Sequence, residues 1–256
     1  MKITIITPSY NQGQFIEETI LSVKNQSHQN VEHIVVDGGS IDNTVEILKK
    51  YPSVIWLSER DEGQADALQK GLKMATGEVV GWVNSDDFYE PDALEFVSNY
   101  FETNPDVNWI IGNISLVYGH EKTATPIKSP KITKKNLFSN PDNIRQQGAF
   151  FRKQALLDAG GFDKNFQYTM DLDLWFRLLK QSNPVMIDKN LAYFRWHEDQ
   201  KTSAKMIDKQ KTEILRVLKK NNASLYYRNK LIFRKFILSQ TSRAGNIKKK
   251  LKKKDV

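Results

Sequence analysis

The chain has 256 residues, of which 39% are hydrophobic and 27% are charged, a composition typical of a folded globular protein. It contains no cysteine, which excludes disulfides and thiolate metal sites and favours a reducing cytoplasm. No apolar run approaches the roughly 18–20 residues that span a bilayer, and the first residues turn polar too soon for a secretory signal, so we expect a cytoplasmic protein.

The first half of the chain alternates short runs rich in Val and Ile with amphipathic runs. In the amphipathic runs the apolar residues recur at helical spacing, as at Phe15, Ile16, Ile20 and Val23. The other runs are short and almost continuously apolar, which is typical of buried strands in a parallel sheet. The predicted strands are 2–7, 31–37, 53–59 and 78–84, and the predicted helices are 14–26, 43–51 and 64–75.

The second half has a less regular pattern. Its predicted elements are one strand or two at 107–119, a loop with a short helix at 120–143, a strand at 144–153 and a helix at 170–181. The alternation of strands and helices predicts an α/β fold, with a mostly parallel central sheet flanked by helices. We expect this domain to span 1–200 and a helical C-terminal extension to occupy 201–256.

Polar loops follow the predicted strands, at the edge of the sheet where such folds bind ligands. In TPSYNQG, Tyr10 could stack on a nucleotide base, or the segment could be an ordinary strand–helix turn. In DGGSIDNT, Asp37 could accept hydrogen bonds from a base or a ribose, or be a solvated acid of the turn. In ERDEGQAD, Gln64 lies near a helix N-terminus, and Lys70 could simply pair with Asp66 four residues before it.

The loop NSDD places Asp86 and Asp87 directly after the fourth predicted strand. Pro91 predicts the start of the next helix, because proline favours the first helical position. The two acids then stand too early to cap that helix. Adjacent carboxylates without a capping role suit a hard cation such as Mg²⁺ or Mn²⁺, and a solvated acidic turn is the alternative.

Three more titratable residues follow late in the domain. Asp171 and Asp173 stand at the start of the predicted helix at 170–181, where helix capping is the simplest role. Asp171 precedes the apolar stripe of that helix, so its carboxylate can point along the edge of the sheet. His197 lies in the loop RWHEDQ, and both metal ligation and a structural or solvated role remain open.

In this order, the loops resemble those of the family 2 glycosyltransferases with the GT-A fold. The similarity is greatest to bacterial enzymes that build O-antigens, capsules and exopolysaccharides, and it covers about residues 2–200. It rests on the ordered segments TPSYNQGQFIEETILSVKNQ, VEHIVVDGGSIDNTVEIL, GQADALQKGLKMATGEVVGWVNSDD, YEPDAL, GGFD and MDLDLWFRL.

The resemblance implies a nucleotide-sugar site, with UDP as the expected nucleotide. Pro8, Tyr10 and Asp37 would hold the base and the ribose. The residues implied in binding the nucleotide sugar are Pro8, Tyr10, Asp37, Gln64, Lys70, Asn84, Ser85 and Asp86. Asn84 departs from the family pattern, in which an aspartate is common at this position.

The resemblance also implies a metal ion and a catalytic base. NSDD occupies the Asp-x-Asp position of the family, so Asp86 would be the principal ligand of Mn²⁺ or Mg²⁺ and Asp87 a weaker one. His197 falls where many relatives have a histidine in a loop over the diphosphate. Asp171 occupies the position of the catalytic base, and Met170 replaces the glutamate that usually precedes it. A single base predicts one displacement with inversion at the sugar.

The C-terminal segment is strongly basic. Residues 201–256 hold 18 Lys or Arg and 3 Asp or Glu, whereas residues 1–200 hold 20 and 27. The segment 224–238 predicts an amphipathic helix with basic margins, and KKKLKKK follows at 248–254. This pattern is typical of attachment to an anionic membrane surface. The alternative is a helix packed on the domain with a solvated tail.

We therefore expect a metal-dependent, inverting hexosyltransferase that uses a glycan or lipid-linked glycan acceptor at the inner face of the cell membrane. The main alternative is a non-catalytic nucleotide-sugar or glycan-binding module, which the departures at Asn84 and Met170 favour. Nucleic acid is not an expected partner, because the basic residues cluster at one end without base-stacking motifs. The chain also lacks the phosphate loop of sugar nucleotidyltransferases and the Gln-x-x-Arg-Trp motif of processive synthases.

Overall fold

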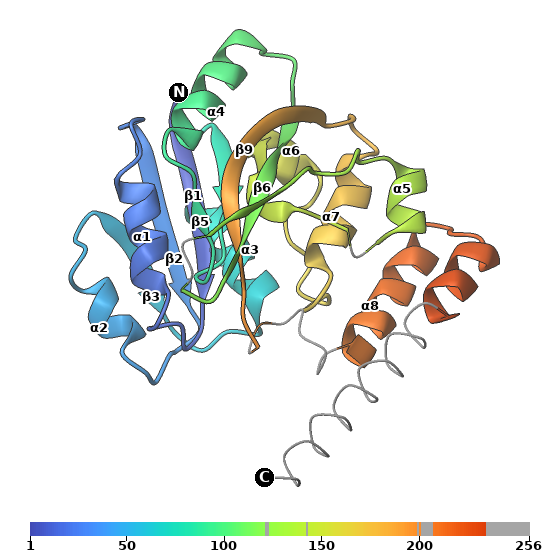
Figure 1. The fold of residues 1–256 in the computed structure, drawn as a ribbon, viewed down its shortest axis with the longest axis horizontal. Coiled ribbons are helices and arrows are strands. Elements are labelled where there is room, and N and C mark those ends of the chain that lie inside the picture. Colours follow the sequence, from blue (N-terminus) through green and yellow to red (C-terminus); the bar gives the residue numbers. More distant parts are fainter. Residues whose placement is uncertain (121–122, 142, 199, 201–206, 234–256) are drawn as a thin grey trace, which may run out of the picture.

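One nine-stranded sheet forms the centre of the protein (Figure 1). The computed structural model describes residues 1–120, 123–141, 143–198, 200 and 207–233. The strands are β1 (Ile3–Ser9), β2 (Val31–Asp37), β3 (Val54–Ser58), β4 (Val79–Trp82), β5 (Phe88–Tyr89), β6 (Trp109–Tyr118), β7 (Thr125–Ile127), β8 (Ala149–Arg152) and β9 (Val185–Trp196). Their order is β3-β2-β1-β4-β8-β6-β9-β5, and β7 pairs with β6.

Helices cover both faces of this sheet. They are α1 (Ile16–Lys24), α2 (Thr44–Leu48), α3 (Gln64–Met74), α4 (Ala93–Thr103), α5 (Lys134–Ser139), the 3₁₀ turn η1 (Gln146–Gly148), α6 (Lys153–Asp158), α7 (Met170–Leu178) and α8 (Ile207–Lys220). Ile16 of α1 and Leu48 of α2 pack with Val35 of β2. Leu68 of α3 packs with Ile34. Because successive strand residues point to opposite faces, α3 lies on the other side of the sheet from α1 and α2.

The sheet has a parallel half and a mixed half. Strands β3, β2, β1 and β4 are parallel, so their carboxyl ends meet at one edge. Strand β8 runs antiparallel to both β4 and β6, while β9 is parallel to β6 and antiparallel to β5. The α/β class is therefore confirmed. The parallel arrangement describes the first four strands, and the strands after them introduce the antiparallel pairs.

The structure differs from the sequence prediction at several elements: β5, β7 and α6 were not predicted, and three further differences affect longer segments. Helix α4 begins at Ala93 rather than Pro91, because Asp92 adopts a left-handed conformation (φ 62°) that cannot lie within a helix. The strand predicted at 144–153 divides into η1 and the short β8. Strand β9 was not predicted. Its middle is exposed at Asp188 and Lys189, which breaks the apolar pattern of a buried strand.

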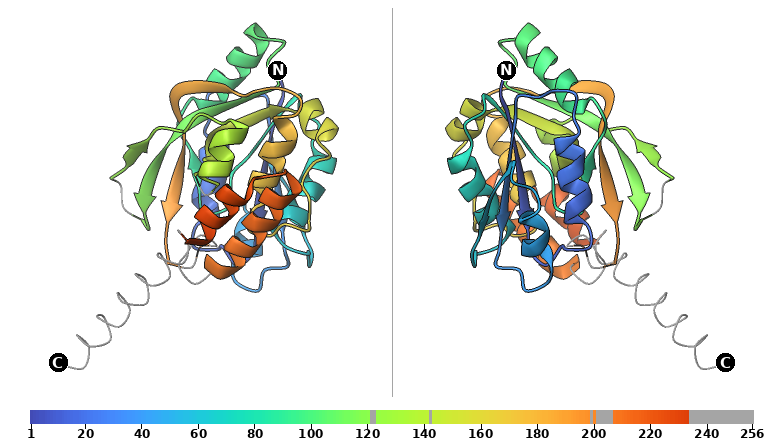
Figure 2. Two further views of the ribbon diagram at one scale, coloured as in Figure 1. Left: turned by 90° about the vertical axis from the view of Figure 1, so that its right-hand side faces the viewer. Right: turned by 90° about the vertical axis from the view of Figure 1, so that its left-hand side faces the viewer.

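Helix α8 shares the main hydrophobic core. Its Val217 and Leu218 are fully buried, in the same cluster as Trp175 of α7. Lys220 Nζ also lies 2.8 Å from the carboxylate of Asp173, a fully buried residue of α7. Figures 1 and 2 show α8 beside α7, and Figure 1 shows that α8 is far from α1 and α2. Helix α8 is thus packed onto the domain, whereas the alternative considered above concerns the later segment 224–238.

A second helical stretch, at 225–233, follows α8. Leu231 is buried there, whereas Leu225, Tyr226 and Phe233 are exposed. The rest of the predicted amphipathic segment and the lysine-rich end lie outside the described residues. Within the part that is described, no helix has the length and apolar character needed to cross a membrane.

Candidate active site

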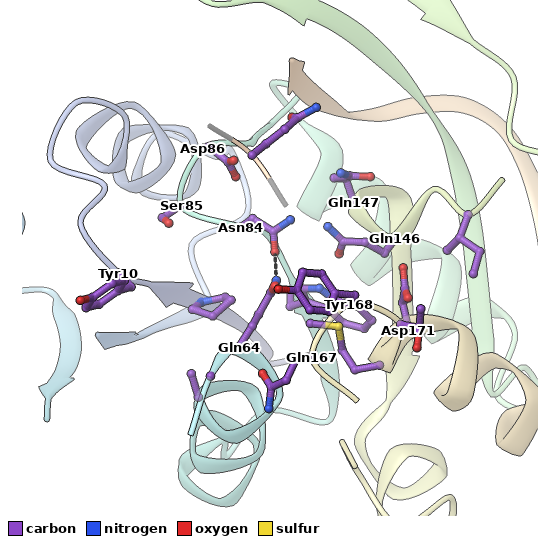
Figure 3. Close-up of a pocket in the computed structure, with 18 of the residues that line it drawn as sticks. Tyr10, Gln64, Asn84, Ser85, Asp86, Gln146, Gln147, Gln167, Tyr168 and Asp171 are labelled. Carbon is purple, nitrogen blue, oxygen red and sulfur yellow. Dashed lines mark hydrogen bonds between the residues drawn. The ribbon is translucent and has the colours of Figure 1, made fainter. Parts of the chain in front are cut away.

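A cavity of about 890 Å³ opens where β1 and β4 end (Figure 3). Its size falls in the range of about 300–1,000 Å³ that is usual for small-molecule sites. Figure 3 shows Asp86 and Asp171 on different sides of this cavity, with Asn84 and Gln146 between them. The predicted site residues that line it are Pro8, Tyr10, Gln64, Asn84, Ser85, Asp86 and Asp171.

The loop after β1 is tied to the loop after β2. Asn11, which has a φ of 52°, donates its backbone N–H to Ser40 Oγ (2.7 Å) and accepts the N–H of Ile41 at its side-chain oxygen (2.9 Å). Beside it, the ring of Tyr10 is 59% exposed at the cavity wall, close in sequence to Pro8. An exposed aromatic ring in this place can stack on a nucleotide base.

Asp37 is fully buried, so it is not the solvated turn acid of the alternative interpretation. Its carboxylate accepts hydrogen bonds from the backbone N–H of Ser40 (2.8 Å) and from the hydroxyl of Ser58 (2.7 Å). These contacts hold the glycine turn, and Gly38 rather than Asp37 lines the cavity. A contact between Asp37 and a base or ribose stays a prediction, which requires the carboxylate to exchange one of these partners for the ligand.

Lys70 and Ser85 differ in their relation to the cavity. Lys70 Nζ lies 2.7 Å from Glu59 and 3.3 Å from Asp66, and Lys70 is not among the lining residues. The hydrogen bond to Glu59 is the main cause that raises the pKa of Lys70. Ser85 lines the cavity, and its carbonyl lies 3.0 Å from Thr19 Oγ1 of α1. The role of Lys70 at a nucleotide stays a prediction, since its ammonium is already paired.

Gln64 and Asn84 both line the cavity and are hydrogen-bonded to each other. Gln64 Nε2 donates to Asn84 Oδ1 at 2.7 Å, and Asn84 Nδ2 donates to Asp87 Oδ2 at 3.2 Å. An aspartate at position 84 could not donate this second bond and would bring another negative charge to Asp87. The asparagine that stands here in place of the family's common aspartate therefore suits the buried carboxylate of Asp87.

Asp86 and His197 meet from two distant parts of the chain. Asp86 Oδ2 lies 3.0 Å from His197 Nε2, and the His197 ring packs on Phe15 with centroids 4.8 Å apart. Asp86 lines the cavity and His197 an adjoining hollow, and Trp196 borders both. A carboxylate and an imidazole are ligands that Mn²⁺ accepts. No larger group of acids and histidines suited to a metal occurs in the described chain, so substrate oxygens and water would complete the coordination.

Asp87 is turned into the protein and is 1% exposed. Its carboxylate accepts hydrogen bonds from the backbone N–H of Arg195 (2.9 Å), Gln147 Nε2 (3.0 Å) and Asn84 Nδ2 (3.2 Å). Burial, followed by the negative charge of Asp86, raises the pKa of Asp87 well above its usual range, against these hydrogen bonds. In this placement Asp87 supports the loop, and acting as a metal ligand would require it to lose protein donors.

Arg195 of β9 stabilises the loop that contains Asp86 and Asp87 from the protein interior. Its guanidinium is 2% exposed, lies between the rings of Phe15 and Phe88 at 5.2 and 5.1 Å, and donates from Nε to the Asp86 carbonyl at 2.9 Å. It also pairs with Glu18 of α1. Sequence reasoning missed Arg195 because β9 was not recognised as a strand, and an arginine in a polar segment is typical of the surface.

The N-terminus of α7 supplies the opposite wall. Asp171 lines the cavity, and its Oδ1 accepts the backbone N–H of Leu172 at 2.7 Å. A carboxylate here is stabilised by the positive end of the helix dipole. Asp173 is fully buried and bound by Arg177 and Lys220, each at 2.8 Å. Of the two acids predicted at this helix, one faces the cavity and the other connects α7 to α8.

Glu213 of α8 fixes the turn that leads into α7. Its carboxylate accepts the backbone N–H of Gln167 (3.0 Å) and of Tyr168 (2.7 Å), and it bonds the hydroxyl of Thr169 (3.2 Å). These residues directly precede the start of α7, so α8 takes part in positioning Asp171. No local pattern indicates this contact, because 44 to 46 positions separate the partners.

The element order, the acidic loop at the end of β4 and the cavity beside it define a glycosyltransferase with the GT-A fold. The chain belongs to glycosyl transferase family 2, since residues 4–160 match the sequence model of that family. An uncharacterized glycosyltransferase of Nostoc is 31% identical over 140 residues, which are 52% of this chain and 43% of the relative. The chain thus matches less than half the length of that relative.

Two solved structures have the same fold. Residues 1–349 of S. aureus TarS in complex with UDP-GlcNAc superimpose with a TM-score of 0.69 at 21% identity, covering 90% of this chain and 69% of that one. A mannosyltransferase from Pyrobaculum calidifontis in complex with GDP-Man and Mn²⁺ gives a TM-score of 0.63 at 18% identity, covering 92% and 69%. The expected family, fold and enzyme class are therefore confirmed.

Proposed function

We propose that the protein transfers a sugar from a nucleotide sugar, with UDP as the first candidate nucleotide, to a hydroxyl of a glycan or lipid-linked glycan. The observation that carries this proposal is that Asp86 and Asp171 line the same cavity from different walls. Such a transfer can use one acid that holds a cation beside the diphosphate and a second acid that takes the proton from the acceptor hydroxyl. The two related structures with bound nucleotide sugars support the donor class.

The nucleotide would enter beside the loop after β1. The exposed ring of Tyr10 offers a stacking surface for the base, next to Pro8 and Gly38. The paired amides of Gln64 and Asn84 offer further polar contacts deeper in the cavity. With this arrangement, the diphosphate of the donor would lie near the acidic loop at the end of β4.

A carboxylate and an imidazole are both ligands of divalent cations, and Asp86 Oδ2 and His197 Nε2 are 3.0 Å apart, close enough to bind the same ion. We propose that they hold Mn²⁺ or Mg²⁺ together with the diphosphate. When bound, the ion would act as a Lewis acid that neutralises charge on the leaving nucleoside diphosphate. Arg195 supports this group through the Asp86 carbonyl and is not itself one of the residues that line the cavity.

Asp171 is the proposed general base. Its carboxylate takes the proton of the acceptor hydroxyl as that oxygen bonds to the anomeric carbon, while the bond from that carbon to the diphosphate oxygen breaks. Attack on the face opposite the leaving group inverts the configuration. General-base assistance of this kind contributes about 10²–10⁴-fold.

The experiment on this function measures nucleotide-sugar binding and sugar transfer side by side. A panel of UDP-, GDP- and TDP-sugars with Mn²⁺ is screened by thermal shift, and transfer or hydrolysis is then followed for each donor that binds. Asp171→Asn should abolish transfer and leave donor affinity within a few-fold. A wild-type chain that binds a donor and neither transfers nor hydrolyses it would instead be the non-catalytic module that the departures at Asn84 and Met170 favour.

We also propose that the enzyme works at an anionic membrane surface, as in the synthesis of bacterial surface polysaccharides. The exposed apolar side chains of the helical stretch 225–233 are Leu225, Tyr226, Ile232 and Phe233. Arg228 and Lys230 lie on the same stretch. Basic residues near an anionic surface contribute about 1 kcal/mol each. Sedimentation with vesicles that contain anionic lipid should pull down the wild type and leave a Tyr226→Ser/Phe233→Ser variant in solution.

A further inference from the structure

Gln146 is a buried amide with no hydrogen-bond partner among the described residues. It lies in η1, is 8% exposed and lines the cavity. Neither its Nε2 nor its Oε1 finds a partner within the protein as described. Burial of an unpaired amide destabilises a folded chain, so nearly all such groups in native proteins are paired.

The other amides nearby are used differently. Gln147, the next residue, donates to Asp87 at 3.0 Å, and Gln64 donates to Asn84 at 2.7 Å. These two amides hold the protein together. The donor and the acceptor of the Gln146 side chain, by contrast, have no partner among the described residues, and Figure 3 shows this side chain between Asn84 and Asp171.

The location of Gln146 suggests what pairs with it. In the reaction proposed above, the transferred sugar lies between the diphosphate, near Asp86, and the acceptor hydroxyl, near Asp171. Gln146 is on the cavity wall between these two acids (Figure 3). A sugar ring presents neighbouring hydroxyl or acetamido groups, which offer one donor and one acceptor close together, as an amide requires.

We propose that Gln146 is a specificity-determining residue that binds the transferred sugar of the donor. Its Oε1 accepts from one sugar hydroxyl, and its Nε2 donates to a neighbouring hydroxyl or acetamido oxygen. The inference rests on the proposed function and goes beyond it, because it separates recognition of the sugar from recognition of the nucleotide.

The test compares Gln146→Met, which keeps the length of the side chain and removes its polar atoms, with Gln154→Met. Gln154 is exposed on α6, so its substitution is the matched control. Calorimetry with Mn²⁺ measures the Kd of UDP or GDP, whichever the wild type binds, and of the corresponding nucleotide sugar. Thermal unfolding of each free protein is recorded in parallel.

For Gln146→Met we expect the Kd of the nucleotide sugar to rise about 10–100-fold, which is the loss of two neutral hydrogen bonds. The Kd of the nucleoside diphosphate should stay within about twofold, and the free variant should unfold at the same temperature or higher, since a buried unpaired amide has been removed. Gln154→Met should change none of these values.

Three results would overturn the inference. Equal nucleotide-sugar affinity in wild type and Gln146→Met would remove Gln146 from donor recognition, as would a loss confined to the KM of the acceptor. Equal weakening of diphosphate and nucleotide sugar would indicate a structural role only. Failure of the wild type to bind any nucleotide would instead reject the proposed function, so the two failures are distinguishable.

Discussion

Asp86 and His197 stand 111 positions apart in the chain, yet Asp86 Oδ2 and His197 Nε2 are 3.0 Å apart. The contact joins the end of β4 to the end of β9, and Arg195 reinforces it two residues before the histidine. The ends of β4 and β9, which are not neighbours in the sheet, must therefore both be in their folded positions before this pair can form. Its function as a metal site can be tested separately from its role in the fold.

Asp86→Ala and His197→Ala should each abolish the Mn²⁺ dependence of nucleotide binding. A small non-ligating side chain removes one of two protein ligands and leaves the base-stacking surface intact. Calorimetric titration of UDP or GDP with and without Mn²⁺ measures the effect. The exposed Asp188 provides the control, since Asp188→Ala should leave the metal effect unchanged. Retained Mn²⁺ dependence in both variants would contradict the assignment.

The adjacent acids should respond differently to the same substitution. Asp87→Asn places an amide where three donors converge on a carboxylate, so we expect a loss of about 1–3 kcal/mol in the free energy of unfolding. Asp86→Asn should cost little stability and should weaken metal binding. Urea unfolding and Mn²⁺ titration of both variants test whether Asp87 stabilises the fold while Asp86 binds the metal. Equal behaviour of the two variants would refute this difference in roles.

Glu213 should affect catalysis although it lies in the C-terminal extension. Glu213→Ala leaves the N–H groups of Gln167 and Tyr168 without their acceptor, so the turn before Asp171 loosens. We expect kcat to fall about tenfold or more, with a smaller change in the KM of the donor. Asp208→Ala, an exposed acid on the same helix, is the matched control and should leave both constants unchanged.

His33 should make the protein less stable in mild acid. Burial lowers its pKa to about 3 in the folded state, whereas an unfolded histidine titrates near 6.5. The unfolded chain therefore gains a proton first as the pH falls. Stability is complete above about pH 6.5 and decreases towards pH 3, by up to about 1.4 kcal/mol per pH unit.

Urea unfolding at pH 7.5, 6.5 and 5.5 should show this decrease as a difference between the wild type and a His33 variant, because the raised pKa of Asp87 acts in the opposite direction in both proteins. His33→Gln, which can retain a hydrogen bond to Thr7, should reduce the slope, and His120→Gln, at an exposed position, should preserve it. Glu32 does not interfere in this range. Although burial opposes the shift, hydrogen bonds from Thr4 and Thr76 lower its pKa to about 2, so it affects stability only below about pH 4.5.

The parallel half of the sheet was predictable because its signals are local. Continuous Val and Ile runs and helical spacing located β1 to β4 and α1 to α3 with small errors at the ends. The strand-end rule then directed attention to Tyr10, Gln64 and Asp86, which do line the cavity. Asp37 satisfies the same rule and Lys70 lies in the helix after such a loop, but the sequence could not indicate that Ser58 and Glu59 bind them.

The second half could not be predicted in this way, since its site residues depend on distant partners. Arg195, Glu213 and Gln147 act through contacts with residues 44 to 177 positions away. Gln146 and Gln147 are chemically identical neighbours, and only the three-dimensional structure shows that Gln147 is paired whereas Gln146 has no partner in the part of the chain that is described.

The contacts of α8 have a thermodynamic consequence. Glu213 and Lys220 connect this helix to the two ends of the first turn of α7, and the exposed helical stretch follows five residues later. Any surface or partner whose affinity depends on the position of α8 is thereby linked to occupancy of the cavity. Linkage is reciprocal: if such binding strengthens acceptor affinity by some factor, the bound acceptor must strengthen that attachment by the same factor.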